Sequence, residues 1–182
     1  MGVPREGKAQ LHHCDYQPAL GVWTHCKCKA DSLGHWTNST QIHALDSLDN
    51  LNTSNQRILA AAQGKWKDEI AATGVHLWVD VRDVAEAHVA AAEKEGAANK
   101  RFFTLAGHFS NKEIAQNIKK HFPEFKDLPS DSTPGGDYPE GGLEKAYFGF
   151  DNKRSIEVLG LKYRSFEDSI VDTVKSFQAK GL

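Results

Sequence analysis

The sequence lacks the features that define membrane, secreted and nucleic-acid-binding proteins. No apolar run approaches the ~20 residues that a membrane-spanning helix needs, and residues 1–20 contain no apolar core of a secretory signal. The formal net charge is −2 at pH 7, so no positive excess favours nucleic acid or an anionic lipid surface. We therefore predict a cytoplasmic protein with neither nucleic acid nor a membrane as a partner.

Several catalytic motifs are absent as well. The chain contains no G-x-S-x-G turn, no H-E-x-x-H helix and no phosphate-binding P-loop. The composition that remains is that of a globular domain, with 182 residues of which 40% are hydrophobic and 25% charged. A chain of this length is expected to form one domain.

The most informative stretch runs from Leu77 to His88. Leu77, Val79 and Val81 alternate with Trp78 and Asp80, which predicts a strand. From Val84 onwards the apolar residues follow at helical spacing. Asp83 stands where the N-cap of that helix is expected. A strand that leads directly into a helix predicts an α/β unit.

Capping signals divide the following residues into short elements. Ser110 and Glu113, for example, form a capping box, and Pro123 ends the helix that this box begins. Residues 123–149 are rich in turn-forming residues. The predicted elements are helices from Gln56 to Gln63, from Asp83 to about Lys94, from Ser110 to Phe122, from a cap at Asp151 or Asn152 to Gly160, and from the cap at Ser165 to a point before Gly181, with a strand from Arg101 to Ala106 that Gly107 ends.

Residues 77–88, LWVDVRDVAEAH, also resemble a known family. They are similar to the late strand-to-helix signature of the extended short-chain dehydrogenases/reductases, especially the fungal NADPH-dependent aldehyde and ketone reductases of the methylglyoxal-reductase and dihydroflavonol-reductase type. The resemblance continues through LNTSNQRI, RFF-x-LAG-x-FSNKEIA, LPSDSTPGGDYPEGG and DNKRSIEVLGLKYRSFEDSIVDTVKS, and covers residues 42–180. It implies a Rossmann-like α/β fold, NADPH as cofactor and a small carbonyl compound as substrate.

The resemblance does not include the cofactor-binding and catalytic motifs of that family. Its members bind the cofactor pyrophosphate at a G-x-x-G-x-x-G turn and use a Ser with a Tyr-x-x-x-Lys pair for proton transfer. The chain has no such turn, and none of its four Tyr residues has a Lys four positions later. We therefore expect a C-terminal fragment with an incomplete sheet and part of the substrate domain. No catalytic or cofactor-binding residue is assigned, and this chain is expected to be inactive and to bind no NADPH.

The resemblance nevertheless points to a region for the substrate. In the family the segment around His76 and Trp78 lies near the substrate and the cofactor, and the segment with Tyr138 contributes to the small substrate domain. We therefore take His76, Trp78 and Tyr138 as candidate substrate-pocket residues. An ordinary connector is the alternative interpretation of residues 123–149, since loops serve both purposes.

The first 41 residues differ from the rest, because they hold all the Cys residues and show no periodicity. His and Cys ligands suit zinc, which gives a second hypothesis, a zinc-stabilised binding module. Cys26 and Cys28 are separated by only one residue, however, whereas structural zinc sites use C-x₂₋₄-C, so we assign no metal ligand. The residues of this alternative site are His12, His13, Cys14, His25, Cys26, Cys28 and His35.

We prefer another interpretation, in which residues 1–41 come from coding sequence that is translated in the wrong reading frame. In this interpretation a retained intron shifts the frame, and the frame of the family is recovered at residue 42. Codons for residues 9–24 can be chosen so that a one-base shift yields PNFTIATINPPLVFGP, which is similar to a strand of the same family. Codons for Cys26-Lys27-Cys28 can contain GTAAGT, a splice-donor sequence. Because such a segment was never selected to pack, we predict that residues 1–41 are poorly ordered and that residues 42–182 form the C-terminal part of a cofactor and substrate domain.

Overall fold

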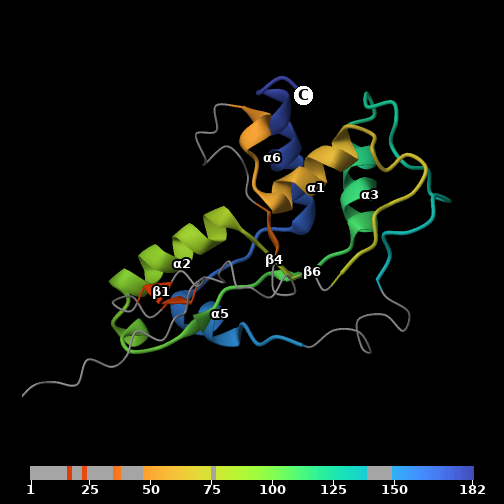
Figure 1. Ribbon diagram of the computed structural model, residues 1–182. Helices are drawn as coiled ribbons and strands as arrows, with labels where there is room; N and C mark the ends of the chain where they lie inside the picture. Colours follow the sequence, from red (N-terminus) through yellow and green to blue (C-terminus); the bar gives the residue numbers. More distant parts are fainter. Residues whose placement is uncertain (1–15, 18–21, 24–34, 38–46, 75–76, 139–148) are drawn as a thin grey trace, which may run out of the picture.

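The computed structural model describes residues 16–17, 22–23, 35–37, 47–74, 77–138 and 149–182. Both helices and strands occur along these residues, although they do not alternate strictly (Figure 1). The elements are β1 (Tyr16–Gln17), β2 (Val22–Trp23), β3 (His35–Thr37), η1 (Leu48–Asn50), α1 (Thr53–Ala62), β4 (Leu77–Asp80), α2 (Val81–Glu93), η2 (Glu95–Ala97), β5 (Phe102–Phe103), β6 (Gly107–His108), α3 (Asn111–His121), α5 (Lys153–Leu159) and α6 (Phe166–Gln178).

The strands form two small sheets. One has the order β1-β2-β5 and the other has the order β3-β4-β6. β5 pairs in parallel with β2, and β4 pairs in parallel with β3 and antiparallel with β6. This mixed arrangement of very short strands confirms the prediction of an α/β fold with an incomplete sheet.

The strand predicted from Arg101 to Ala106 is wrong in its extent. Only Phe102 and Phe103 form a strand there, and Gly107, which was expected to end the strand, begins β6. The alternative pairing explains the difference, because Gly107 lies opposite Trp78 of β4. Glycine relieves crowding at that place, since a Cβ atom at position 107 would lie 3.3 Å from Nε1 of Trp78, which is a tight contact.

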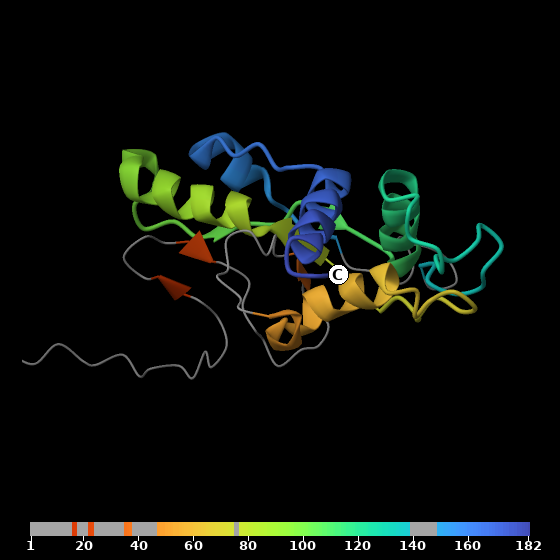
Figure 2. The same ribbon diagram turned by 90° about the horizontal axis from the view of Figure 1, so that it is seen from above.

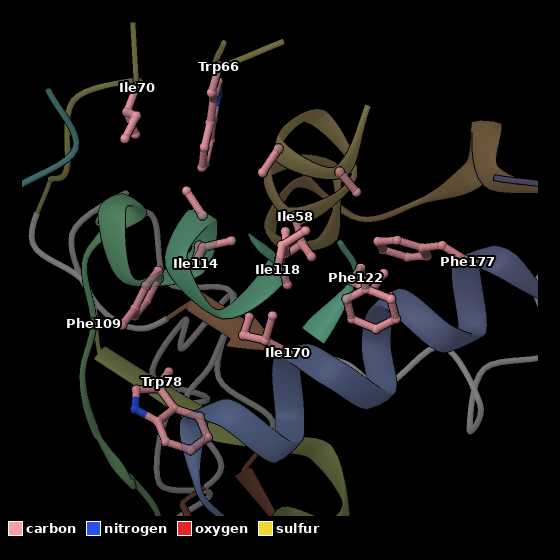
Figure 3. Packing of buried hydrophobic residues seen from close by; sticks show 14 of the residues in the cluster. Ile58, Trp66, Ile70, Trp78, Phe109, Ile114, Ile118, Phe122, Ile170 and Phe177 are labelled. Atoms are coloured by element: carbon pink, nitrogen blue, oxygen red, sulfur yellow. The ribbon is translucent and has the colours of Figure 1, made fainter. Parts of the chain in front are cut away.

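Three helices enclose the larger hydrophobic core, which we call the helical cluster. α1, α3 and α6 pack against one another, and their aliphatic side chains point toward a common centre (Figure 3). Burial of this apolar surface is the main source of stability for the helices. The helical cluster consists of Leu51, Ile58, Ala61, Ala62, Trp66, Ile70, Trp78, Phe109, Ile114, Ala115, Ile118, Phe122, Ile170, Val174 and Phe177.

A second, smaller core lies on the other side of β4, and we call it the strand cluster. It joins α2, η2 and β5 to α5 and the residues that follow α5. Figures 1 and 2 show α2 and α5 together, apart from α1 and α3. The strand cluster consists of Ala87, Ala91, Ala97, Phe102, Leu159 and Leu161.

The helix starts confirm most of the predicted caps. The Ser110 side chain accepts from the backbone N–H of Glu113, whose carboxylate accepts from the N–H of Ser110, so the capping box is complete. The N-cap prediction for Asp83 is wrong. Asp80, the last residue of β4, caps α2 by accepting from the backbone N–H of Arg82, because the strand continues into the helix without a loop.

Most of the first 41 residues lie outside the described residues, so the predicted boundary between residues 41 and 42 stays a prediction. Of this segment the structure describes the backbone pairing of three short strands only. The zinc candidates likewise lie outside the described residues, apart from the backbone of His35 in β3. Within the described ranges no helix is long and apolar enough to cross a bilayer.

Candidate functional site

Trp78 lies in the middle of β4, with its side chain in the helical cluster (Figure 3). It is only 5% exposed. Its ring centre is 5.1 Å from that of Phe166 at the start of α6, and Phe166 in turn lies 5.3 Å from Phe109. These distances are those of ordinary aromatic packing, so Trp78 joins the central strand to α6.

Tyr138 is held by the start of α3. Its hydroxyl donates to Oε2 of Glu113 at 2.8 Å, and the same oxygen accepts from the backbone N–H of Ser110 at 2.6 Å. The Glu113 carboxylate therefore caps α3 and also binds Tyr138, which is the last described residue of the loop 123–138.

Asn111, the first residue of α3, connects this loop to residues 71–73. Asn111 is 0% exposed; its Nδ2 donates to the carbonyl oxygens of Ala71 and Ala72. Its backbone N–H donates to Oγ1 of Thr73, which donates to the carbonyl oxygen of Gly136 at 2.5 Å. We call Thr73, Asn111 and Gly136 the loop clasp, because they tie two loops to the first turn of α3.

The loop clasp requires glycine at two successive positions. Gly135 and Gly136 have φ values of 87° and 71°, which residues with a Cβ atom rarely adopt. A Cβ atom at position 135 would also lie 2.2 Å from the carbonyl oxygen of Ile70. The sequence Gly135-Gly136 thus allows the backbone of this loop to approach the backbone near Ile70.

The carboxylate of Asp80 is the centre of a buried polar network. Asp80 is 0% exposed and accepts from Nε and Nη2 of Arg82 and from Oγ of Ser169 on α6. Arg82 also donates to Asp172 at 2.6 Å. Burial acts to raise the pKa of Asp80, but the hydrogen bonds from Arg82 and Ser169 outweigh burial and hold this pKa below its ordinary value.

Asp83 has a different partner and the opposite pKa shift. It is 1% exposed and accepts from the backbone and the guanidinium of Arg164, which also pairs with Glu86 at 2.7 Å. Burial raises the pKa of Asp83 above its ordinary value, although the hydrogen bonds from Arg164 act to lower it. Asp80 and Asp83 together connect β4 and α2 to both ends of the segment from Arg164 to Asp172.

Two further features of the described residues bear on possible chemistry. No group of three or more His, Cys, Asp and Glu side chains in the described ranges could hold a metal ion. Tyr163 donates to or accepts from Ser155, and burial raises its pKa, but no Lys stands four residues later to assist it. The hydrogen-bond networks described above hold neighbouring segments of the chain together, and we assign no proton transfer or hydride transfer to them.

The three predicted pocket residues lie in different environments or outside the described residues. His76 lies outside the described residues, Trp78 is buried and Tyr138 is bound to Glu113. The structure anchors Trp78 and Tyr138 to opposite ends of the segment from Gly107 to Glu113, and the pocket itself stays a prediction. Sequence reasoning missed Asn111, whose only signal was its place inside the capping box.

Comparison with known proteins finds that the chain is similar to proteins named as a ketoreductase, as a putative NADPH-dependent methylglyoxal reductase and as Gre2 in complex with NADPH. No family model matches the chain. Ketoreductase azaE from Aspergillus niger is 46% identical over 136 residues, which are 74% of this chain and 38% of that protein. A protein described as a putative NADPH-dependent methylglyoxal reductase, GRP2 from Candida albicans, is 31% identical over 134 residues, again 74% of this chain and 38% of that protein.

A solved structure supports the same relationship. The crystal structure of Gre2 from Candida albicans in complex with NADPH has a TM-score of 0.61 and 36% identity, and covers 72% of this chain and 38% of that protein. The chain thus spans less than two fifths of the length of these relatives. This coverage is consistent with the predicted C-terminal fragment, and the family resemblance predicted from residues 42–180 is confirmed.

Proposed function

We propose that the chain corresponds to the substrate-side portion of a reductase that converts an aldehyde or a ketone to an alcohol with NADPH. In this reaction a hydride passes from the nicotinamide to the carbonyl carbon, and the carbonyl oxygen takes up a proton. Orientation is the protein's contribution to hydride transfer by such a cofactor. The observation that carries this proposal is the 36% identity and 0.61 TM-score with a protein solved as an NADPH complex.

The described residues support a positioning role. The loop clasp fixes residues 133–138 against α3, and the networks of Asp80 and Asp83 fix β4 against α6. A site that must hold a small substrate needs such rigid support. We propose that the face near Trp78 and Tyr138 contributes to the substrate pocket, with His76 as a third member.

We further propose that the 182-residue chain alone does not turn over substrate. The G-x-x-G-x-x-G turn and the Tyr-x-x-x-Lys pair of the family are both missing from its sequence. Without the turn, no backbone N–H groups bind the pyrophosphate. Without the pair, no Lys lowers the pKa of a Tyr that could donate the proton to the carbonyl oxygen.

A turnover assay tests this proposal. The purified chain is mixed with NADPH and methylglyoxal, and the loss of nicotinamide absorbance is followed, with the NADPH-dependent methylglyoxal reductase GRE2 from Saccharomyces cerevisiae as the positive control. We expect a rate equal to the rate without protein. Turnover that depends on both NADPH and methylglyoxal, and that scales with the concentration of this chain, would overturn the proposal of inactivity.

A further inference from the structure

Two basic dipeptides that are far apart in the sequence meet at one surface depression. Lys100-Arg101 directly precedes β5, and Lys153-Arg154 begins α5. The packing of β5 against α5 in the strand cluster brings the two segments together. The resulting open depression of about 560 Å³ is lined by Asn99, Lys100, Arg101, Arg154 and Val158.

A hydrogen bond and a backbone turn fix the positions of the polar groups in this depression. Nη1 of Arg154 donates to the carbonyl oxygen of Arg101 at 3.1 Å, which holds the guanidinium across the depression and uses one of its five N–H donors. Asn99 has a φ of 58°, a left-handed conformation that turns the chain just before Lys100. The three cationic side chains of the lining therefore come from two elements that are fixed to each other.

The depression has no acidic lining residue, although the chain as a whole is acidic. Its lining contains three cations, whereas the formal net charge of the chain is −2. The nearest acids in the sequence, Asp151 and Glu157, are not part of the lining. Among the described residues, neither Lys100 nor Arg154 forms an ion pair with a carboxylate. Elsewhere in these ranges, lysines such as Lys67, Lys112 and Lys119 do form such pairs.

We propose that this depression, which we call the basic depression, binds a small ligand that carries phosphate groups. Guanidinium groups bind phosphate oxygens through parallel N–H donors, and a flexible Lys adds a point charge. A volume of about 560 Å³ lies within the ~300–1,000 Å³ of typical small-molecule sites, and it can hold a diphosphate with room for an attached organic group. This proposal does not depend on the proposed reductase function.

Isothermal titration of the whole chain with pyrophosphate at low ionic strength tests this proposal. We expect saturable binding that weakens as salt is added, because exposed charges are screened. Arg154→Gln and Lys100→Gln are each expected to weaken binding about tenfold, which is the loss of one charge-assisted hydrogen bond. Lys175→Gln removes the same charge from an exposed position on α6 and is expected to leave binding unchanged.

Several outcomes would overturn the proposal. These are no saturable binding of pyrophosphate, equal binding by all the variants, and equal binding of citrate, which carries carboxylates in place of phosphates. Lys100→Gln keeps the test valid if Arg154→Gln does not fold, because the Lys100 side chain is exposed. Arg154→Lys keeps the charge but loses the planar donors, and an intermediate affinity is expected for it.

Discussion

The helical cluster and the strand cluster are held together in different ways. The helical cluster is enclosed by α1, α3 and α6, all of which have well-formed caps and bulky buried side chains. The strand cluster contains three Ala residues among its six members, and its strand β5 pairs with β2 from the first 41 residues. Since buried apolar area determines the hydrophobic contribution, the helical cluster is the main source of stability in the described part of the chain.

The two clusters are joined by the networks of Asp80 and Asp83. Asp80 connects β4 to Ser169 of α6, and Asp83 connects α2 to Arg164 just before α6. Polar groups in these positions contribute specificity, because each carboxylate accepts bonds from donors separated by long stretches of chain. The comparison therefore teaches that apolar packing stabilises each cluster, whereas buried charges fix their relative position.

The largest expected effect is in the helical cluster. Phe177 is 0% exposed, and Phe177→Ala is expected to lower the free energy of unfolding by about 3–5 kcal/mol. Leu159→Ala in the strand cluster is expected to cost about 2–3 kcal/mol, because fewer bulky neighbours surround it. Urea denaturation measures both values, and Gln178→Ala, next to Phe177 but exposed, is the control. A larger loss for Leu159→Ala would reverse our ranking of the clusters.

The next largest effect concerns the charges between the clusters. Asp80→Asn is expected to lower the free energy of unfolding by about 2–3 kcal/mol, which is less than for a fully buried pair because Arg82 is partly exposed. Asp172→Asn removes a carboxylate from the same Arg82, but at a position 28% exposed, and about 1 kcal/mol or less is expected. Equal losses in the two variants, again by urea denaturation, would show that burial of Asp80 is irrelevant.

These networks mark the limit of what the sequence could predict. Local signals sufficed for the helices, since the Ser110 and Ser165 caps and the C-terminal Gly160 depend on residues a few positions apart. The cap of α2 was assigned to Asp83 instead of Asp80 because both carboxylates stand near the same helix start. Arg164 and Ser169 lie more than 80 residues from their partners, and no local pattern reveals such pairs.

The strands and the candidate site were harder to predict for a related reason. The choice between one strand over 101–106 and two shorter pieces depends on the partner strands, which are distant in sequence. Likewise Asn111 was visible only as the first residue of a helix, although its amide group binds the carbonyl oxygens of Ala71 and Ala72, about 40 residues earlier in the chain. Tyr138 was selected by family resemblance alone, and its contact with Glu113 required the structure.

A glycine substitution tests the loop clasp beside the helical cluster. Gly135→Ala is expected to lower the free energy of unfolding by about 2 kcal/mol, because φ is positive and the new Cβ atom meets the carbonyl oxygen of Ile70. Gly149→Ala, where a Cβ atom meets nothing within 4 Å, is expected to change stability by less than ~0.5 kcal/mol. Thermal unfolding distinguishes the two, and a neutral Gly135→Ala would remove the steric argument for the loop clasp.

The smallest expected effect is the pH dependence of stability. The pKa of Asp80 is lowered in the folded chain, so its contribution is present above the unfolded pKa and is lost as pH falls through the folded pKa. The pKa of Asp83 is raised, so its contribution decreases as pH rises from the unfolded pKa through the folded pKa. Asp80→Asn should therefore flatten the rise of stability with pH in the acid range.

Asp83→Asn should have the opposite effect on the same curve. It removes a group whose contribution opposes the rise, so stability should increase more steeply with pH than in the unchanged chain. Urea midpoints at several acid pH values measure both slopes. Slopes that change in the same direction in the two variants would contradict the assignment of opposite pKa shifts to these neighbouring carboxylates.

Direct titration with NADPH, followed by nicotinamide fluorescence, tests most directly whether this chain carries a nicotinamide site. We predict no saturable change in fluorescence for the unchanged chain. Weak binding that disappears in Arg154→Gln would be assigned to the phosphates in the basic depression. Saturable binding in the micromolar range that persists in Arg154→Gln would contradict the account, because a cofactor site would then exist without the G-x-x-G-x-x-G turn.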